Sequence, residues 1–319
     1  MSPRLSESSA ITQNRRELKF KLSEAHASAF AAAVSARIPK HRFQGTGANR
    51  LPRARHYVTT VYFDTVARDL YRAVRADPDS LKIRAREYYD LHPELLELAT
   101  DARDIVRYSP VLWVEIKGNR DGRTYKRRVG IPKGDVEPFF EHGTVSPAMR
   151  GLLRSSKPPK ARAAVASEFP EPLAEQEQEP VANQQSIDSS EVIAELSSLR
   201  ARFTEPLRAS CLVNYRRTAF EDAAGTVRIT FDQRMACFAA PPGLWSSNKP
   251  LVREALGAPA YEEPTYIVEV KARGELPNWL SDLLVQVGAQ PHVFSKFLTA
   301  SETVYGLQPV PPNSARDTG

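Results

Sequence analysis

Apolar and polar residues alternate along several short segments of the chain. The clearest is LKIRAREYY (81–89), in which Lys82, Arg84 and Arg86 share one side and apolar residues share the other. Because successive side chains of a strand point to opposite faces, this pattern predicts a strand with one apolar and one cationic face. Similar segments predict further strands, at 17–21, 56–64, 111–119, 124–132, 210–221, 226–235 and 265–273.

Three other segments are typical of helices, at 23–38, 278–288 and 295–305. Ser23 is a suitable N-cap for the first helix, and Pro39 follows its end. No strand is followed by a glycine-rich turn and a helix, so neither a Rossmann nor a P-loop nucleotide site is supported. The order of segments predicts an antiparallel α+β fold.

The predicted elements fall into one domain over residues 15–307. Within it, residues 157–198 are poor in aromatic residues and rich in Pro, Glu, Gln and Ser, a composition that cannot bury enough apolar surface to fold alone. We therefore expect a disordered acidic insertion there. Residues 1–14 and 308–319 are expected to be a disordered lead and tail.

The positive charge belongs to the predicted folded part. The chain has a net charge of +6, and residues 15–133 contain 25 Lys and Arg against 14 Asp and Glu. Residues 163–199 contain no Lys or Arg and 8 Asp and Glu. A basic fold suggests an anionic partner, which by charge alone includes nucleic acid, phosphate compounds and acidic membranes.

Nothing in the sequence indicates export or insertion into a membrane. The N-terminal residues include no apolar signal core, and there is no run of 18 apolar residues. Cys211 and Cys237 have no metal-ligand spacing, and we expect free thiols in a reducing compartment. The expected location is the cytoplasm.

The charged faces of the strands are compatible with two geometries. A flat basic sheet would be a nucleic-acid platform, and a closed barrel would direct the charges into a lumen. A platform usually carries aromatic residues for base stacking, whereas these faces hold few, chiefly Tyr88, Trp113 and Tyr215; Trp113 is itself interpreted as core. Glutamates also lie among the cations, which favours a cavity for metal and phosphate over a nucleic-acid platform. They are Glu17, Glu115 and Glu269.

A lumen lined by cations needs a counter-charge. Two like charges ~6 Å apart at an effective dielectric constant of ~20 repel by about 3 kcal/mol. Arginine binds phosphate oxygens bidentately and lysine supplies point charges, so a linear condensed phosphate fits such a lumen. A glutamate there can hold a divalent ion that bridges to phosphate oxygens.

Several motifs occur in the order found in a known family. They are RRELKF, TTVYFDT, LKIRAREYY, VEIKGNRDGRTYKRRV, NYRRTAF, VRITFD, YIVEVKA and FSKFL. In this respect the chain resembles the VTC (vacuolar transporter chaperone) polyphosphate polymerase domain of the triphosphate tunnel metalloenzyme superfamily. The resemblance implies an eight-stranded antiparallel β tunnel or barrel, open at both ends, with a basic lumen and flanking helices.

The resemblance also implies an activity, namely transfer of the γ-phosphate of ATP to a growing polyphosphate chain with Mn²⁺ or Mg²⁺. The partners are then ATP or another nucleoside triphosphate and inorganic polyphosphate, without nucleic acid or membrane insertion. The implied metal ligand is Glu269, and Lys82 and Glu115 are expected to assist. The implied phosphate contacts are Lys19, Arg84, Arg86, Lys117, Lys126, Arg128, Arg217, Arg228, Lys271 and Lys296.

Two other functions remain open at this stage. The superfamily includes hydrolases of inorganic triphosphate with an E-x-E-x-K strand, but here the residue two positions after Glu17 is Lys19. A non-catalytic polyphosphate or nucleotide sensor is the third possibility. It is suggested by Val293, where family members often have a second lysine before FSK. Neither a phosphate-sensing SPX domain nor membrane helices are found, so we expect a stand-alone catalytic domain of bacterial type.

Overall fold

The alternating segments form one antiparallel sheet. The computed structural model describes residues 15–41, 55–89, 111–120, 123–154, 189–245 and 251–307. The strands of this part are β1 (Arg15–Leu22), β2 (Arg55–Asp64), β3 (Lys82–Tyr89), β4 (Val111–Arg120), β5 (Arg123–Pro132), β6 (Arg208–Glu221), β7 (Val227–Ala239), β8 (Tyr261–Glu262) and β9 (Tyr266–Arg273). All eight strands predicted from the sequence are confirmed, and the two-residue β8 is an addition.

Helices flank the sheet, and more of them form than the sequence predicts. The predicted ones are α1 (Glu24–Ser35), α7 (Asn278–Gln286) and α8 (Lys296–Tyr305). Ser23 caps α1 by accepting a hydrogen bond from the His26 N–H, as expected. The additional helices are α2 (Asp69–Ala76), α4 (Lys133–His142), α5 (Pro147–Arg154), α6 (Ser189–Ala201) and the short 3-10 helix η2 (Arg253–Leu256).

The sheet is curved but is not closed by hydrogen bonds. Its strand order is β1-β9-β7-β6-β2-β3-β4-β5, with β8 paired to β7. Among the described residues, the edge strands β1 and β5 do not pair with each other, so the structure is an open channel and not a closed barrel. Part of the β1 edge is covered by a bridge from Phe20 to Pro291 and by a hydrogen bond from the His292 N–H to the Lys19 carbonyl.

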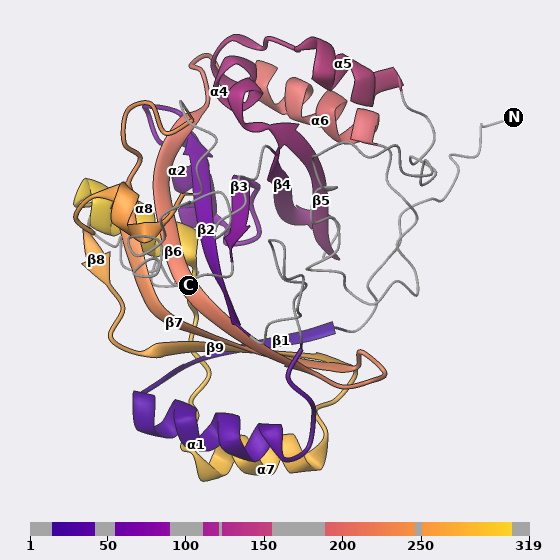
Figure 1. Cartoon of the computed structure of the whole chain (residues 1–319), viewed down its shortest axis with the longest axis vertical. Coiled ribbons are helices and arrows are strands. Elements are labelled where there is room, and N and C mark those ends of the chain that lie inside the picture. Colours follow the sequence, from indigo (N-terminus) through magenta and orange to yellow (C-terminus); the bar gives the residue numbers. More distant parts are fainter. Residues whose placement is uncertain are drawn as a thin grey trace, which may run out of the picture.

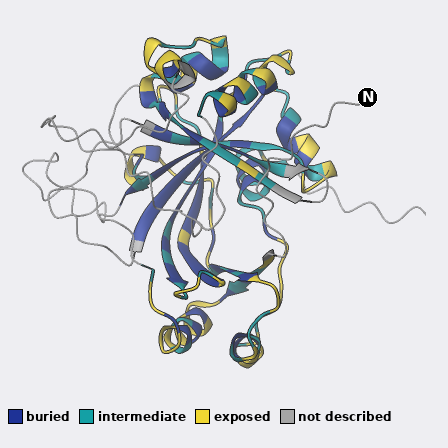
Figure 2. Cartoon of the chain, turned by 90° about the vertical axis from the view of Figure 1, so that its right-hand side faces the viewer, coloured by how far each residue is buried: buried dark blue, intermediate teal, exposed yellow. Residues whose placement is uncertain are grey.

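The apolar face of the sheet is convex and lies under the helices. Figure 1 shows α1 and α7 beside β1 and β9, and α4, α5 and α6 beside β4 and β5. Phe30 and Val34 of α1 pack with Val268 and Val270 of β9 in one buried cluster. A second cluster joins the remaining strands to α4, α5 and α6. The strands are mainly buried, and exposed residues lie on the outer faces of the helices (Figure 2).

One helix packs on the other face of the sheet. Tyr62 pairs in register with Arg84, so both side chains lie on the charged face. The Tyr62 ring is 5.0 Å from that of Phe297 in α8, and Cys211 Sγ on the same face is 3.6 Å from Ser301 Oγ. Helix α8 therefore occupies one end of the concave face. The apolar side of α8 is buried there, so this part of the concave face is covered.

The expected disordered segments lie largely outside the described residues. This applies to residues 1–14, 157–188 and 308–319. Residues 189–198, expected to belong to the acidic insertion, lie in α6, where Val192, Ile193 and Leu196 are buried against the sheet. Their apolar spacing stabilises a packed helix within an acidic stretch.

Two further expectations concern the cysteines and the membrane. Cys211 and Cys237 are buried free thiols, as expected. In the part of the chain that the structure describes, no helix has the length and apolar content needed to cross a bilayer.

Candidate functional site

The strand register gathers the predicted cations on the concave face. Across β1, β9 and β7, Glu17 pairs with Lys271 and Lys271 with Arg228. Across β3, β4 and β5, Lys82 pairs with Lys117 and Lys117 with Lys126. Because directly paired residues share a face, both ends of the sheet present cations to the same side. The predicted contacts on strands of this face are Lys19, Arg84, Arg86, Lys117, Lys126, Arg128, Arg217, Arg228 and Lys271.

The two ends of the sheet face each other across the channel. Lys117 of β4 lies close enough to Glu17 and Lys271 for their charges to act on its pKa. Lys82 of β3 lies close enough to Lys19 of β1 to do the same. Since β1 and β9 are far from β3 and β4 along the strand order, only strong curvature of the sheet brings these residues together.

Glu115 is the counter-charge on the β3–β5 side. It is fully buried, and its Oε2 accepts a hydrogen bond of 2.7 Å from Arg84 Nε. Arg86 Nε lies 3.8 Å from the same oxygen, and Lys126 Nζ lies 3.3 Å from Oε1. One carboxylate therefore holds three of the predicted phosphate-binding residues, which is a positioning role.

Asp232 plays the same part on the opposite side. Its carboxylate accepts hydrogen bonds of 2.7 and 2.9 Å from Arg217 Nε and Nη2, and Lys296 Nζ lies 2.7 Å from Oδ2. Burial by itself would raise the pKa of Asp232, but the charges of Arg217 and Lys296 hold it below its usual range. Asp232 was not predicted as a site residue, because the alternation places it on the charged face without showing its partners.

Lys296 enters the channel from α8. Burial alone would lower its pKa, but the adjacent Asp232 carboxylate raises it above the ordinary lysine value. Its ammonium also lies 4.9 Å from the centre of the Tyr215 ring. Lys296 is thus held charged at the helix N-terminus, where a cation is unfavourable unless an anion is close.

Some cations of this face have no ion pair with any residue that the structure describes. Arg228 is only 7% exposed and Lys117 is half-buried, and neither lies within 4 Å of a carboxylate. Arg128 lies over the Trp113 ring, with its guanidinium carbon 4.9 Å from the ring centre. Burial lowers the pKa of Lys117 to about 8, with the charges of Arg84 and Lys271 adding to the shift. In the described part of the chain, no anion is paired with these cations.

Buried hydroxyl groups beside the cations also lack a partner. In the described residues, Thr60 Oγ1, Thr230 Oγ1 and Tyr215 Oη are buried without a hydrogen bond. Thr60 pairs in register with Arg86 and Thr230 with Glu269, so they belong to the charged face. Buried polar groups in proteins are nearly always hydrogen-bonded. Their position beside the cations of this face is that of donors for the oxygens of an anion.

Two carboxylates surround one cation on β1 and β9. Lys271 Nζ lies 2.9 Å from Glu269 Oε1 and 3.8 Å from Glu17 Oε2. Burial alone would raise the pKa of Glu269, but the charges of Lys271, Arg217 and Lys19 hold it well below its usual range. Glu269 is therefore an anion at neutral pH.

This pair of carboxylates fits a divalent ion of the Mg²⁺ or Mn²⁺ type. Such ions take hard oxygen ligands, and Mg²⁺ commonly uses one or two carboxylates with phosphate oxygens and water. No cluster of three or more His, Cys, Asp or Glu forms among the described residues. Glu269 and Glu17 thus offer a partial ligand set that a bound phosphate would have to complete.

Lys82, which is expected to assist binding, contacts the turn that precedes its strand. It starts β3 on the charged face, but its ammonium donates hydrogen bonds of 2.6 and 3.3 Å to the carbonyls of Pro78 and Ser80. Burial lowers its pKa, and the charges of Lys19 and Arg84 contribute to that shift. Lys82 is therefore turned toward the preceding turn.

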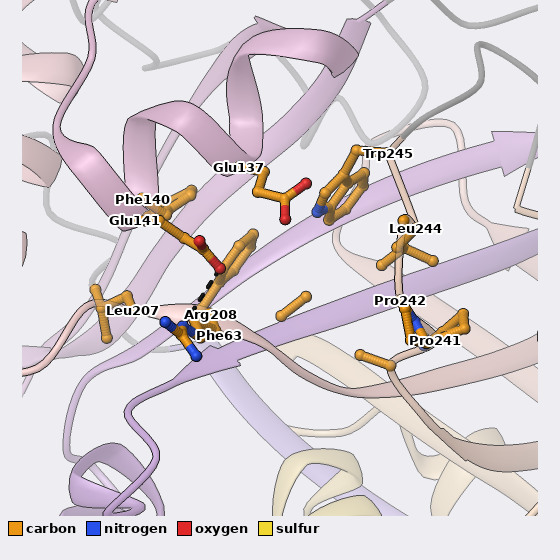
Figure 3. A pocket seen from close by; sticks show the side chains of 13 residues that line it. Phe63, Glu137, Phe140, Glu141, Leu207, Arg208, Pro241, Pro242, Leu244 and Trp245 are labelled. Atoms are coloured by element: carbon orange, nitrogen blue, oxygen red, sulfur yellow. Dashed lines mark ion pairs between the residues drawn. The ribbon is translucent and has the colours of Figure 1, made fainter.

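A separate cavity of about 200 Å³ lies on the convex side (Figure 3). Phe63 and Phe140, which line it, stack with ring centres 4.1 Å apart, and Glu137 also lines it. Arg208 Nε lies 3.4 Å from Glu141 Oε1 there. The cavity includes none of the channel cations and has more carboxylates than cations, so it does not suit phosphate.

Comparison with known proteins identifies a family. The profile of the VTC domain family matches residues 14–305. No curated protein matches the sequence. Among solved structures, the chain is similar to a candidate adenylate cyclase from Bacillus halodurans, with a TM-score of 0.42 and 10% identity over 90% of this chain and 98% of that one.

Proposed function

The chain belongs to the VTC domain family, and on that premise we propose that it is a polyphosphate polymerase that uses ATP and a divalent metal ion. One observation carries the proposal: among the described residues, the concave face combines cations without an ion pair, such as Lys117 and Arg228, with buried hydroxyl groups that have no hydrogen-bond partner. A linear condensed phosphate supplies both needs, since every phosphate unit carries charge and acceptor oxygens.

In the proposed reaction, a terminal oxygen of polyphosphate attacks the γ-phosphorus of ATP. The bond between the γ-phosphorus and the β–γ bridging oxygen breaks, and ADP leaves with that oxygen. Phosphoryl transfer needs little covalent chemistry from a protein, so positioning and charge stabilisation dominate. Arg84, Arg217 and Lys296 are suited to this role because Glu115 and Asp232 fix their positions.

A divalent ion would be held by Glu269 and Glu17 and would neutralise charge on the transferred phosphoryl group. Lys271, between these carboxylates, would then turn to the phosphate chain. Lys117 and Arg228 have no ion pair with a carboxylate of the described residues, so they can bind phosphate without first breaking one.

A hydrolase of inorganic triphosphate is the second candidate. It would use the same two carboxylates to orient water. The first strand disfavours it, because Lys19 occupies the place of a further carboxylate and its Nζ lies 3.2 Å from Glu17 Oε1. A cation at this position neutralises a potential metal ligand, which suits transfer better than hydrolysis.

Incubation with ATP labelled at the γ-phosphate and Mn²⁺ tests the proposal. Labelled polymer and labelled free phosphate are measured separately in the same reaction. We expect label in polymer and ADP in equal molar amount. Free phosphate without polymer would assign the hydrolase, and binding without either product would assign a sensor.

A further inference from the structure

Trp113 lies on the charged face and not in the core as the sequence suggested. It pairs in register with Arg86 of β3, so its indole projects to the channel side. It is half-buried and, among the described residues, belongs to neither buried apolar cluster. A large aromatic side chain outside the core and among cations is a candidate for binding a ligand.

The strand beside the indole carries no side chain at the paired position. Its paired residue on β5 is Gly130, which has no side chain. A glycine inside a strand often marks a place where a ligand approaches closely. Arg128 precedes Gly130 by two residues in β5. Its guanidinium lies over the indole, and the distance from the central guanidinium carbon to the ring centre is 4.9 Å. A planar guanidinium and an indole together form a surface on which a flat ring can stack.

The other aromatic residues of this face already make close contacts, and Tyr62 packs on Phe297 with ring centres 5.0 Å apart. Tyr215 is fully buried, with Lys296 4.9 Å and Arg217 5.1 Å from its ring centre. Tyr88 packs against the apolar core, makes an edge contact with His56 and accepts a hydrogen bond from Arg86. Trp113 is therefore the aromatic residue of this face whose ring is best placed to receive a ligand.

The spacing along β4 relates Trp113 to the cations. Lys117, Glu115 and Trp113 follow one another on the same face, and residues two apart in a strand are separated by about 7 Å. Trp113 is one such step from the Glu115 cluster, which includes Arg84, and two steps from Lys117. A ligand with phosphates at these cations and a ring at its other end would reach the indole.

We propose that Trp113, with Arg128, is the stacking platform for the base of a nucleoside triphosphate and so distinguishes ATP from inorganic polyphosphate. This inference rests on the proposed function, because it takes the phosphates to lie on the adjacent cations. Base–aromatic stacking contributes to binding whatever the base, so the platform favours nucleotides as a class and does not select adenine. Trp113 determines specificity and takes no part in the transfer.

The test compares two ligands that share a triphosphate and differ in the base. ATP and inorganic tripolyphosphate are titrated calorimetrically into the full chain and into its Trp113→Ala variant, each with Mg²⁺. We expect Trp113→Ala to weaken ATP binding about tenfold to hundredfold, the range of base stacking. Tripolyphosphate binding should change less than twofold.

Two further variants protect the test against a folding defect. Gly130→Val adds a β-branched side chain beside the indole, suits a strand, and is expected to weaken ATP selectively. Trp113→Phe keeps a smaller ring and should lie between wild type and Trp113→Ala. With Trp279→Phe on α7 as the matched control, ATP should quench tryptophan fluorescence in the control and not in Trp113→Phe.

Other results would overturn the inference. An equal loss for both ligands would show that Trp113 acts on the phosphates or the fold, and no loss for either would show that the base lies elsewhere. If the wild-type chain binds tripolyphosphate and ATP equally, the base gains nothing from the platform. If it binds neither, the proposed function fails as well, so the two failures are distinguishable.

Discussion

Lys296 Nζ lies 2.7 Å from Asp232 Oδ2, and Arg217 donates hydrogen bonds of 2.7 and 2.9 Å to the same carboxylate. This buried carboxylate therefore joins β6, β7 and α8 at the channel. Its two cations come from positions 79 residues apart in the sequence. We therefore expect the positions of Arg217 and Lys296 to depend on Asp232.

Asp232→Asn tests this dependence. Asparagine keeps the shape but not the charge, so two buried cations lose their counter-ion and the chain should lose about 3 kcal/mol of unfolding free energy. Misplacement of Arg217 and Lys296 should lower kcat about a hundredfold. Denaturant titration and steady-state kinetics measure the two effects. Asp282→Asn, at an exposed site on α7, is the matched control, and an unchanged kcat in Asp232→Asn would remove the positioning role.

Glu115→Gln should reveal the repulsion among the cations of β3 and β5. Without the carboxylate, Arg84, Arg86 and Lys126 lose a shared counter-charge, and we expect the thermal midpoint to fall by several degrees. Tripolyphosphate should restore more stability to this variant than to wild type, because it replaces the missing anion. A thermal shift no larger than that of wild type would count against phosphate binding at this cluster.

Lys117 should give binding a pH dependence above neutrality. Its folded pKa of about 8 lies below the ordinary lysine value, so free Lys117 loses its proton as pH rises through 8. Only the charged form attracts phosphate, and tripolyphosphate affinity should therefore fall about tenfold between pH 7 and pH 9. Lys117→Arg keeps the charge and should flatten this slope. Lys82, whose pKa is also lowered, adds a smaller dependence.

The stability of the chain without ligand should change with pH in the opposite direction to its affinity for tripolyphosphate. Between the folded pKa of Lys117 and its unfolded value, the unfolded chain binds more protons, so stability should rise with pH in that window. Calorimetric titration in buffers of different ionisation enthalpy would detect proton uptake on binding near pH 8. Equal slopes for wild type and Lys117→Arg would assign the titration to another group.

Glu269→Gln and Glu17→Gln test the proposed metal ligands. Removal of either carboxylate should raise the Mn²⁺ concentration for half-maximal activity about tenfold or more, because each supplies a charged oxygen ligand. Binding of tripolyphosphate without metal should not weaken, since both variants remove negative charge. Weaker metal-free binding in both variants would indicate that these glutamates only hold Lys271 in place.

The alternation predicted the strands and the charged face because each strand shows both faces within a few residues. It could not reveal partners distant in sequence. Glu87 breaks the alternation on the apolar face of β3, where its fully buried carboxylate pairs at 2.7 Å with Lys133 of α4. Asp232 likewise forms an ion pair with Lys296, which is distant in the sequence. Such pairs become visible only when the register and helix docking are known.

Two expectations about which residues are buried differ from the structure. Residues 189–198 are acidic and polar on average, but Val192, Ile193 and Leu196 form a stripe that packs beneath the sheet. The alternation placed Trp113 on the charged face, but the residue was also interpreted as core; its register with Arg86 puts it on the charged face. Average properties of a segment do not determine which side each residue faces.

The central claim is that the concave face holds a linear condensed phosphate, and ligand-dependent unfolding tests it most directly. The chain is melted with tripolyphosphate and with single-stranded DNA of equal phosphate concentration. We expect tripolyphosphate to raise the midpoint by several degrees and DNA to have little effect, with the gain reduced in Arg228→Gln. Stabilisation by DNA equal to or greater than that by tripolyphosphate, or no shift with either, would contradict the account.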